Sequence, residues 1–91
     1  MTLADFPPPA IYDHEYGGRG DVLVMPLAEL RRSACAGVKG TRPVFGCSWH
    51  TKFACTIILP AVGDGITQAD QDMVRRVEAA NCNGWPKGDR E

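Results

Sequence analysis

Residues 54–60 read Ala-Cys-Thr-Ile-Ile-Leu-Pro, the most apolar run in this chain of 91 residues. Apolar and β-branched residues in a run of this length are typical of a strand. Pro60 ends the run because proline has no backbone N–H to donate to a neighbouring strand. The run therefore predicts the most buried strand of a sheet.

Two further strands and a short helix are predicted before this run. Residues 43–49 (Pro-Val-Phe-Gly-Cys-Ser-Trp) form a second strand-like run, and the polar segment 50–52 (His-Thr-Lys) joins the two. Runs connected in this way are typical of an antiparallel hairpin. Residues 21–25 (Asp-Val-Leu-Val-Met) predict another strand, and a short helix follows from Pro26, a favourable first-turn residue, to Ala34.

A long helix is predicted near the C-terminus, beginning at about Gln68. Thr67 and Asp70 have the spacing of a capping box, and an acidic residue in the first turn also complements the helix dipole. Gly84 followed by Pro86 is a stop signal. One mostly apolar stripe recurs at spacings of three and four residues, at Met73, Val74, Val77, Ala80 and Asn81. The residues expected to face elsewhere are Asp70, Asp72, Arg75, Arg76 and Ala79.

These elements predict a small α+β domain. We expect a three-stranded, mostly antiparallel sheet with one short helix after the first strand and one long C-terminal helix across one face. Residues 1–20 contain three consecutive prolines and a Gly-Gly-Arg-Gly stretch, so they are expected to form an extended N-terminal arm. Residues 21–86 then form the single domain, and residues 87–91 form a charged tail.

The charge balance excludes some classes of partner. Ten basic and eleven acidic residues give a net charge of −1, so nothing electrostatic indicates a nucleic acid or an anionic membrane. No apolar run approaches the roughly 20 residues that a membrane span needs. The sequence therefore predicts a soluble protein with no nucleic-acid partner and no membrane partner.

Four cysteines form an even set with no Cys-x-x-Cys pair, which favours two disulfides over a zinc ribbon or a redox motif. Three pairings are possible. We expect Cys35 to pair with Cys47, closing a loop around a glycine-containing stretch, and Cys55 to pair with Cys82, tying the buried strand to the long helix. The alternatives are a zinc site built on Cys47, His50 and Cys55, and free buried thiols.

The compartment stays open on the sequence alone. Disulfides imply an oxidising compartment, hence a periplasmic or secreted protein. Residues 1–9 show no basic segment followed by an apolar core, so no secretory signal is recognised there. Without a removed signal, we expect a cytoplasmic protein with reduced thiols.

Residues 77–86 read Val-Glu-Ala-Ala-Asn-Cys-Asn-Gly-Trp-Pro. This segment resembles the His-Glu-x-x-His-Cys-Asn-Gly-Trp-Pro signature of small zincin-like proteins, which are common on bacterial chromosomes and mobile elements. Residues 12–16 (Tyr-Asp-His-Glu-Tyr), 45–47 and 55–60, together with all four cysteines, are also similar to that family. The resemblance covers most of residues 11–89 and implies a minimal zincin-like scaffold.

The metal ligands of the family are replaced in this chain. In a His-Glu-x-x-His helix two histidines four residues apart bind one zinc, and the glutamate polarises a water molecule. Val77 and Asn81 stand at the histidine positions, and Asp89 aligns with the third ligand, or Arg90 if the tail is one residue longer. Valine has no lone pair and a neutral amide suits zinc poorly. We therefore expect no bound metal or cofactor and no catalytic residue, with Glu78 as the one residue of the catalytic signature that remains.

The resemblance implies a pseudo-enzyme that binds another protein. By analogy, it further implies an inhibitor of host or defence machinery, of the anti-CRISPR type, encoded on a mobile element. The aromatic candidates for partner binding are Phe6, Tyr12, Tyr16 and Trp49. Trp85 is expected to fill the core.

Two other interpretations compete with this one. A metal-dependent peptidase would use Glu78 as general base and would hold zinc through some combination of Asp89, Asn81 and His14 or His50. Alternatively, the segment is an ordinary amphipathic core helix, and Glu78 is then a solvated surface residue.

Overall fold

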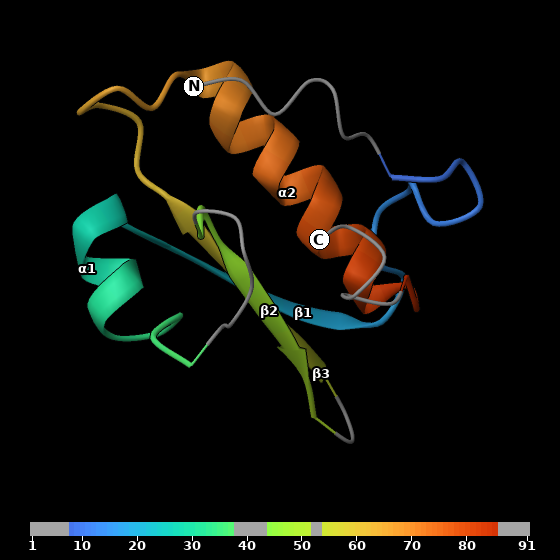
Figure 1. The fold of residues 1–91 in the computed structure, drawn as a ribbon. Coiled ribbons are helices and arrows are strands. Elements are labelled where there is room, and N and C mark those ends of the chain that lie inside the picture. Colours follow the sequence, from blue (N-terminus) through green and yellow to red (C-terminus); the bar gives the residue numbers. More distant parts are fainter. Residues whose placement is uncertain (1–7, 38–43, 52–53, 86–91) are drawn as a thin grey trace.

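The computed structural model describes residues 8–37, 44–51 and 54–85. Its elements in chain order are β1 (Arg19–Met25), α1 (Leu27–Arg32), β2 (Cys47–His50), β3 (Ala54–Pro60) and α2 (Gln68–Cys82). The expected small α+β class, with one short helix and one long C-terminal helix, is confirmed (Figure 1). No helix in these ranges is long and apolar enough to cross a membrane.

The sheet has the order β1-β3-β2, so β3 is its central strand. β2 pairs with β3 in the antiparallel hairpin that the sequence predicts. β1 pairs with β3 in parallel, from Arg19 opposite Ala54 to Met25 opposite Pro60. The sheet is therefore mixed. The parallel pairing follows from the connection through α1, because a parallel pair needs a crossover whereas a hairpin joins antiparallel strands.

The central strand divides the core into two clusters, one on each face of the sheet. Successive side chains of a strand point to opposite faces. Cys55, Ile57 and Leu59 pack with Val74 and Cys82 of α2. Ile58, between them, points the other way and packs with Leu30 of α1 and with Cys35 and Cys47. The prediction that this is the most buried strand is confirmed, because residues 57–60 are all buried.

Several boundaries differ from the sequence prediction. β1 begins at Arg19, so the last two residues of the expected arm belong to the sheet. α1 ends at Arg32, two residues before Ala34. β2 begins only at Cys47, and residues 44–46 lead into it without strand pairing. The sequence shows strand-like composition in residues 44–46, but this lead-in passes close to α2 at Gly46 and does not pair with β3.

Two disulfides connect these elements, in the pairs favoured by the sequence. Cys35 after α1 is bonded to Cys47 of β2, with 5.8 Å between their Cα atoms. Cys55 of β3 is bonded to Cys82 at the end of α2, with 6.0 Å between their Cα atoms. The alternative zinc site on Cys47, His50 and Cys55 is wrong in this structure, because neither sulfur is a free thiolate.

Both ends of α2 are built by the local signals that the sequence contains. The Thr67 side chain accepts a hydrogen bond from the Asp70 N–H at 3.1 Å, and the Asp70 carboxylate accepts one from the Thr67 N–H at 2.9 Å. These bonds complete the predicted capping box. The hydrogen bond from the Thr67 backbone holds the pKa of Asp70 below its usual range. The other end of the helix is part of the candidate site.

Candidate functional site

Glu78 lies on the face of α2 that packs against the sheet. Its exposed fraction is 2%, so the expectation of a solvated surface residue is wrong. The buried residues of the helix are Asp70, Val74, Glu78, Ala80, Asn81 and Cys82, whereas Met73 and Val77 are only half-buried. The buried face of α2 is therefore rotated relative to the predicted apolar stripe, and it includes the two acidic residues Asp70 and Glu78.

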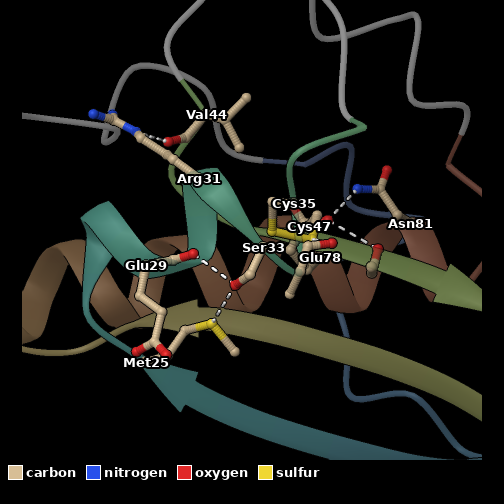
Figure 2. Close-up of a disulfide and its surroundings, with 11 residues drawn as sticks. Met25, Glu29, Arg31, Ser33, Cys35, Val44, Cys47, Glu78 and Asn81 are labelled. Carbon is tan, nitrogen blue, oxygen red and sulfur yellow. Dashed lines mark hydrogen bonds between the residues drawn. A yellow bond between two sulfur atoms is a disulfide. The ribbon is translucent and has the colours of Figure 1, made fainter.

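The Glu78 carboxylate accepts hydrogen bonds from two buried side chains. The Ser48 hydroxyl of β2 donates a hydrogen bond to Glu78 Oε1 at 2.8 Å. The Asn81 amide, one turn further along α2, donates to the same oxygen at 3.1 Å (Figure 2). We call Ser48, Glu78 and Asn81 the Glu78 cluster. It links the long helix to the edge strand β2 in the protein interior.

Gly46 allows α2 to come close enough for this link. A Cβ atom at this position would lie 2.5 Å from Val74 Cγ1 and 2.8 Å from the Ile58 carbonyl oxygen, both impossibly short contacts. It would also lie 3.9 Å from Glu78 Cγ. A glycine is therefore required where the chain passes between α2 and β3, directly before β2 brings Ser48 under the helix.

The two positions of α2 that align with the zincin histidines do not form a metal site. Val77 is half-buried and presents only hydrocarbon. The Asn81 amide nitrogen donates a hydrogen bond to Glu78, and Asn81 Oδ1 is a buried acceptor with no hydrogen-bond partner among the described residues. Asp89 lies outside the described residues. Because zinc needs several nitrogen, sulfur or carboxylate donors around one point, the residues present do not fit it.

The part of the chain that the structure describes offers no alternative metal site. In the ranges 8–37, 44–51 and 54–85, no three His, Cys, Asp or Glu side chains come together in a way that could hold an ion. His14 and His50, the histidines of the peptidase alternative, contact other groups. His14 lies beside the Asn83 side chain, and the His50 ring meets the edge of Tyr16 with 5.5 Å between the ring centroids.

The segment 82–85 ends the helix and closes the domain. Gly84 has a φ of 109°, which favours glycine. Its N–H donates to the Asn81 carbonyl at 3.1 Å, and the Trp85 N–H donates to the Ala80 carbonyl at 3.0 Å. This pair of bonds is a Schellman motif. Trp85 is buried, so its expected role in the core is consistent with the structure.

Asn83 fastens the N-terminal arm to the end of α2. Its side-chain amide donates to the backbone carbonyl of Tyr12 at 3.0 Å and to that of His14 at 2.7 Å. Between these two residues, Asp13 forms an ion pair with Arg76 of α2. The hydrogen bond from Arg76 is the main reason why the pKa of Asp13 is lowered. Residues 82–85 of the segment that resembles the zincin signature therefore each have a structural role.

Of the aromatic residues expected to bind a partner, Trp49 is the most exposed one that the structure describes. Its exposed fraction is 42%. Tyr12 and Tyr16 are half-buried, and Tyr16 packs against the cluster beneath α2. Phe6 lies outside the described residues. Trp49 alternates with Ser48 along β2, so it lies on the sheet face opposite to α2.

Sequence reasoning missed Ser48 and Gly46. A partial signal is the pair of small residues Gly46 and Ser48, two positions apart in the predicted strand, although Phe45 also packs against the cluster beneath α2. Residues at this spacing lie on one face of a strand. Small side chains on one face indicate that another element approaches it closely.

Comparison with protein-family models, with curated proteins and with solved structures found no match to this chain. The likeness to the zincin signature therefore rests on the quoted residues of the chain itself. What the structure adds is the placement of those residues, of which Glu78 and Asn81 meet in the interior.

Proposed function

We propose that this protein is a non-catalytic, zincin-like pseudo-enzyme that acts by binding another protein. The observation that carries the proposal is the direction of Glu78. A catalytic glutamate of a zincin must reach a metal-bound water in an open cleft. Here the carboxylate is 2% exposed and accepts hydrogen bonds from Ser48 and Asn81, so it serves to join α2 to the sheet.

The replaced ligand positions support the same proposal. A valine and an amide that is already hydrogen-bonded cannot supply the two imidazole nitrogens that hold zinc on such a helix. The rival proposal, a peptidase with an atypical ligand set, would need Glu78 and Asn81 to leave the interior together. It would also need ligands from elsewhere in the chain.

Trp49 is the centre of the surface that we propose for the protein partner. It lies opposite Thr56 of β3, and Asp21 of β1 is opposite Thr56 on the other side. These residues form a row across the sheet, on the face opposite to α2. α1 packs where Ile58 and Cys47 are buried, at the neighbouring part of that face. Exposed tryptophan is among the side chains that contribute most to protein interfaces.

We also propose a class of partner and a compartment for the interaction. The likeness to proteins of mobile elements supports an inhibitor of host or defence machinery. Two disulfides in so small a domain support an oxidising compartment, since the cytosol keeps most thiols reduced. We therefore place the partner outside the cytoplasm, which weighs against an intracellular anti-CRISPR role.

Metal analysis tests the non-catalytic half of the proposal. The triple variant Val77→His, Asn81→His, Asp89→His is expected to bind zinc, while the parent purified beside it binds none. A control with two histidines on the exposed face, Gln68→His and Asp72→His, shows how much zinc any such helical pair retains. Stoichiometric zinc in the parent, measured by elemental analysis, would favour the peptidase.

Variants of the sheet face test the binding half. Trp49→Lys is expected to lose the specific partners that the wild-type protein retains from an extract of its host, identified by mass spectrometry. Val62→Lys is the matched control, because Val62 is a similarly exposed apolar residue outside the sheet, with an exposed fraction of 51%. Retention of the same partners by Trp49→Lys would refute Trp49 as the contact.

A further inference from the structure

β1 is an edge strand whose apolar residues remain exposed on both faces of the sheet. The exposed fractions are 40% for Val22, 51% for Leu23 and 54% for Val24. α2 packs against β2 and β3, and α1 packs against β3, so the two helices leave much of β1 uncovered (Figure 1). Open edges of this kind pair readily with another strand, and natural proteins usually block them with lysine, proline or a bulge.

The register identifies the backbone groups that point away from the sheet. The Ala61 N–H donates to the Met25 carbonyl at 2.9 Å, and Met25 is the partner of Pro60. In a parallel ladder a residue bonds to the neighbours of its partner, so Met25 directs its N–H and C=O toward β3. Every second residue before it does the same. The backbone N–H and C=O groups that point away from the sheet therefore belong to Gly20, Val22 and Val24. Among the described residues, none makes a hydrogen bond to these groups.

We propose that this edge binds the same edge of a second copy of the chain. The two β1 strands run antiparallel about a twofold axis at Val22, and the two three-stranded sheets become one continuous sheet. In this register Val22 meets Val22 of the second copy, and Gly20 meets its Val24. Every outward-pointing residue then faces an outward-pointing residue of the other copy.

Neighbouring registers are less favourable. An axis at Leu23 would place Gly20 opposite Pro26, which has no N–H to donate. An axis at Asp21 would bring two carboxylates face to face, which is destabilising. The axis at Val22 keeps the two Asp21 carboxylates apart and places Pro26 opposite Gly18, which lies outside β1.

The surface beside the strand also suits the second copy. A depression with a volume of about 250 Å³ lies over Gly20 and Val22 on the α2 side, with Arg75 of α2 in its wall. In the proposed register, Val24 of the second copy lies opposite Gly20, which has no side chain to crowd it. No charged residue interrupts residues 22–25, and a net charge of −1 gives little long-range repulsion between copies.

Pairing of single strands buries less surface than a standard interface, so the dimer is expected to form reversibly with rising protein concentration. Sedimentation equilibrium of the full chain tests this. The wild-type protein is expected to shift from monomer to dimer, Val24→Lys to stay monomeric, and the control Val62→Lys to dimerise as the wild type does. A wild type that stays monomeric at the highest concentration, or a Val24→Lys variant that dimerises equally well, would overturn the proposal.

Amide hydrogen exchange provides a second, residue-level test. The amides of Gly20, Val22 and Val24 are expected to become protected as the protein concentration rises. Those of Asp21 and Leu23 are expected to be protected at every concentration, because they bond to β3. Protection that rises instead at β2 would identify another interface and refute the edge pairing. Either failure leaves the protein-binding proposal intact, because that proposal depends on Trp49.

Discussion

β1 and β3 are strands of equal length that lie side by side, yet one is exposed and the other buried. Each has seven residues and an apolar stretch of at least four. β3 is paired on both edges and covered by a helix on each face, whereas β1 is paired on one edge only. Apolar composition therefore identifies a strand but does not show whether helices pack over it. An apolar strand that no helix covers is a surface that can bind another protein chain.

The largest expected effect separates these two strands directly. Ile58→Ala should lower the free energy of unfolding by about 2 to 5 kcal/mol, because Ile58 is fully buried between α1 and the sheet. Leu23→Ala, at its register partner on β1, should change it by about 0.5 kcal/mol or less in dilute protein. Urea denaturation measures both. Equal losses would mean that β1 is covered in solution.

The variant Gly46→Ala tests the second-largest effect, the close packing of α2 over β3. The new methyl group would clash with Val74 and with the Ile58 carbonyl, so α2 must move away and stability should fall by about 1 to 3 kcal/mol. Gly37→Ala is the matched control, because an added Cβ atom there meets nothing within 4 Å. Thermal denaturation compares the two variants. Similar melting temperatures would contradict the close approach.

A smaller effect is expected from the Glu78 cluster. Ser48→Ala removes one donor from a buried carboxylate, which should lower stability by about 1 to 2 kcal/mol. The control is Ser33→Ala, since Ser33 is an exposed serine whose hydroxyl donates to the Glu29 carbonyl. Its effect should be about 0.5 kcal/mol or less. If the two serines prove equivalent, Glu78 is not held by Ser48 in solution.

The smallest expected effect is on the pH dependence of stability. The pKa values of Asp13 and Asp70 are lowered in the folded protein, by hydrogen bonds from Arg76 and from the Thr67 backbone respectively. The unfolded chain therefore binds protons more readily, and the stabilisation present above about pH 4 is lost as the pH falls through the lower folded-state pKa values. The double variant Asp13→Asn, Asp70→Asn should show a shallower loss of stability in acid. An unchanged slope in acid denaturation would contradict these contacts.

Short-range signals predicted much of this fold. Thr67 and Asp70 determine where α2 begins, and Gly84 determines where it ends, through bonds to residues at most five positions away. Such signals can be recognised in the sequence because the hydrogen bonds that they form join residues only a few positions apart. The existence of all three strands was also predicted, since strand-forming residues are concentrated in short runs.

The features that were not predicted depend on distant neighbours. The direction of β1 relative to β3 depends on the path of the chain through α1, which strand composition does not encode. The burial of Glu78 depends on Ser48, thirty positions away, and on the gap at Gly46. The resemblance to the zincin signature predicts a helix without metal ligands, but no local pattern in the sequence indicates that the Glu78 carboxylate points into the interior.

The two disulfides lie on opposite faces of the sheet. Cys35–Cys47 belongs to the layer beneath α1, and Cys55–Cys82 belongs to the layer beneath α2. One bond links the segment after α1 to β2, and the other links the last residue of α2 to β3. Cleaving either one would remove the covalent link of a single layer while the link of the opposite layer stays intact.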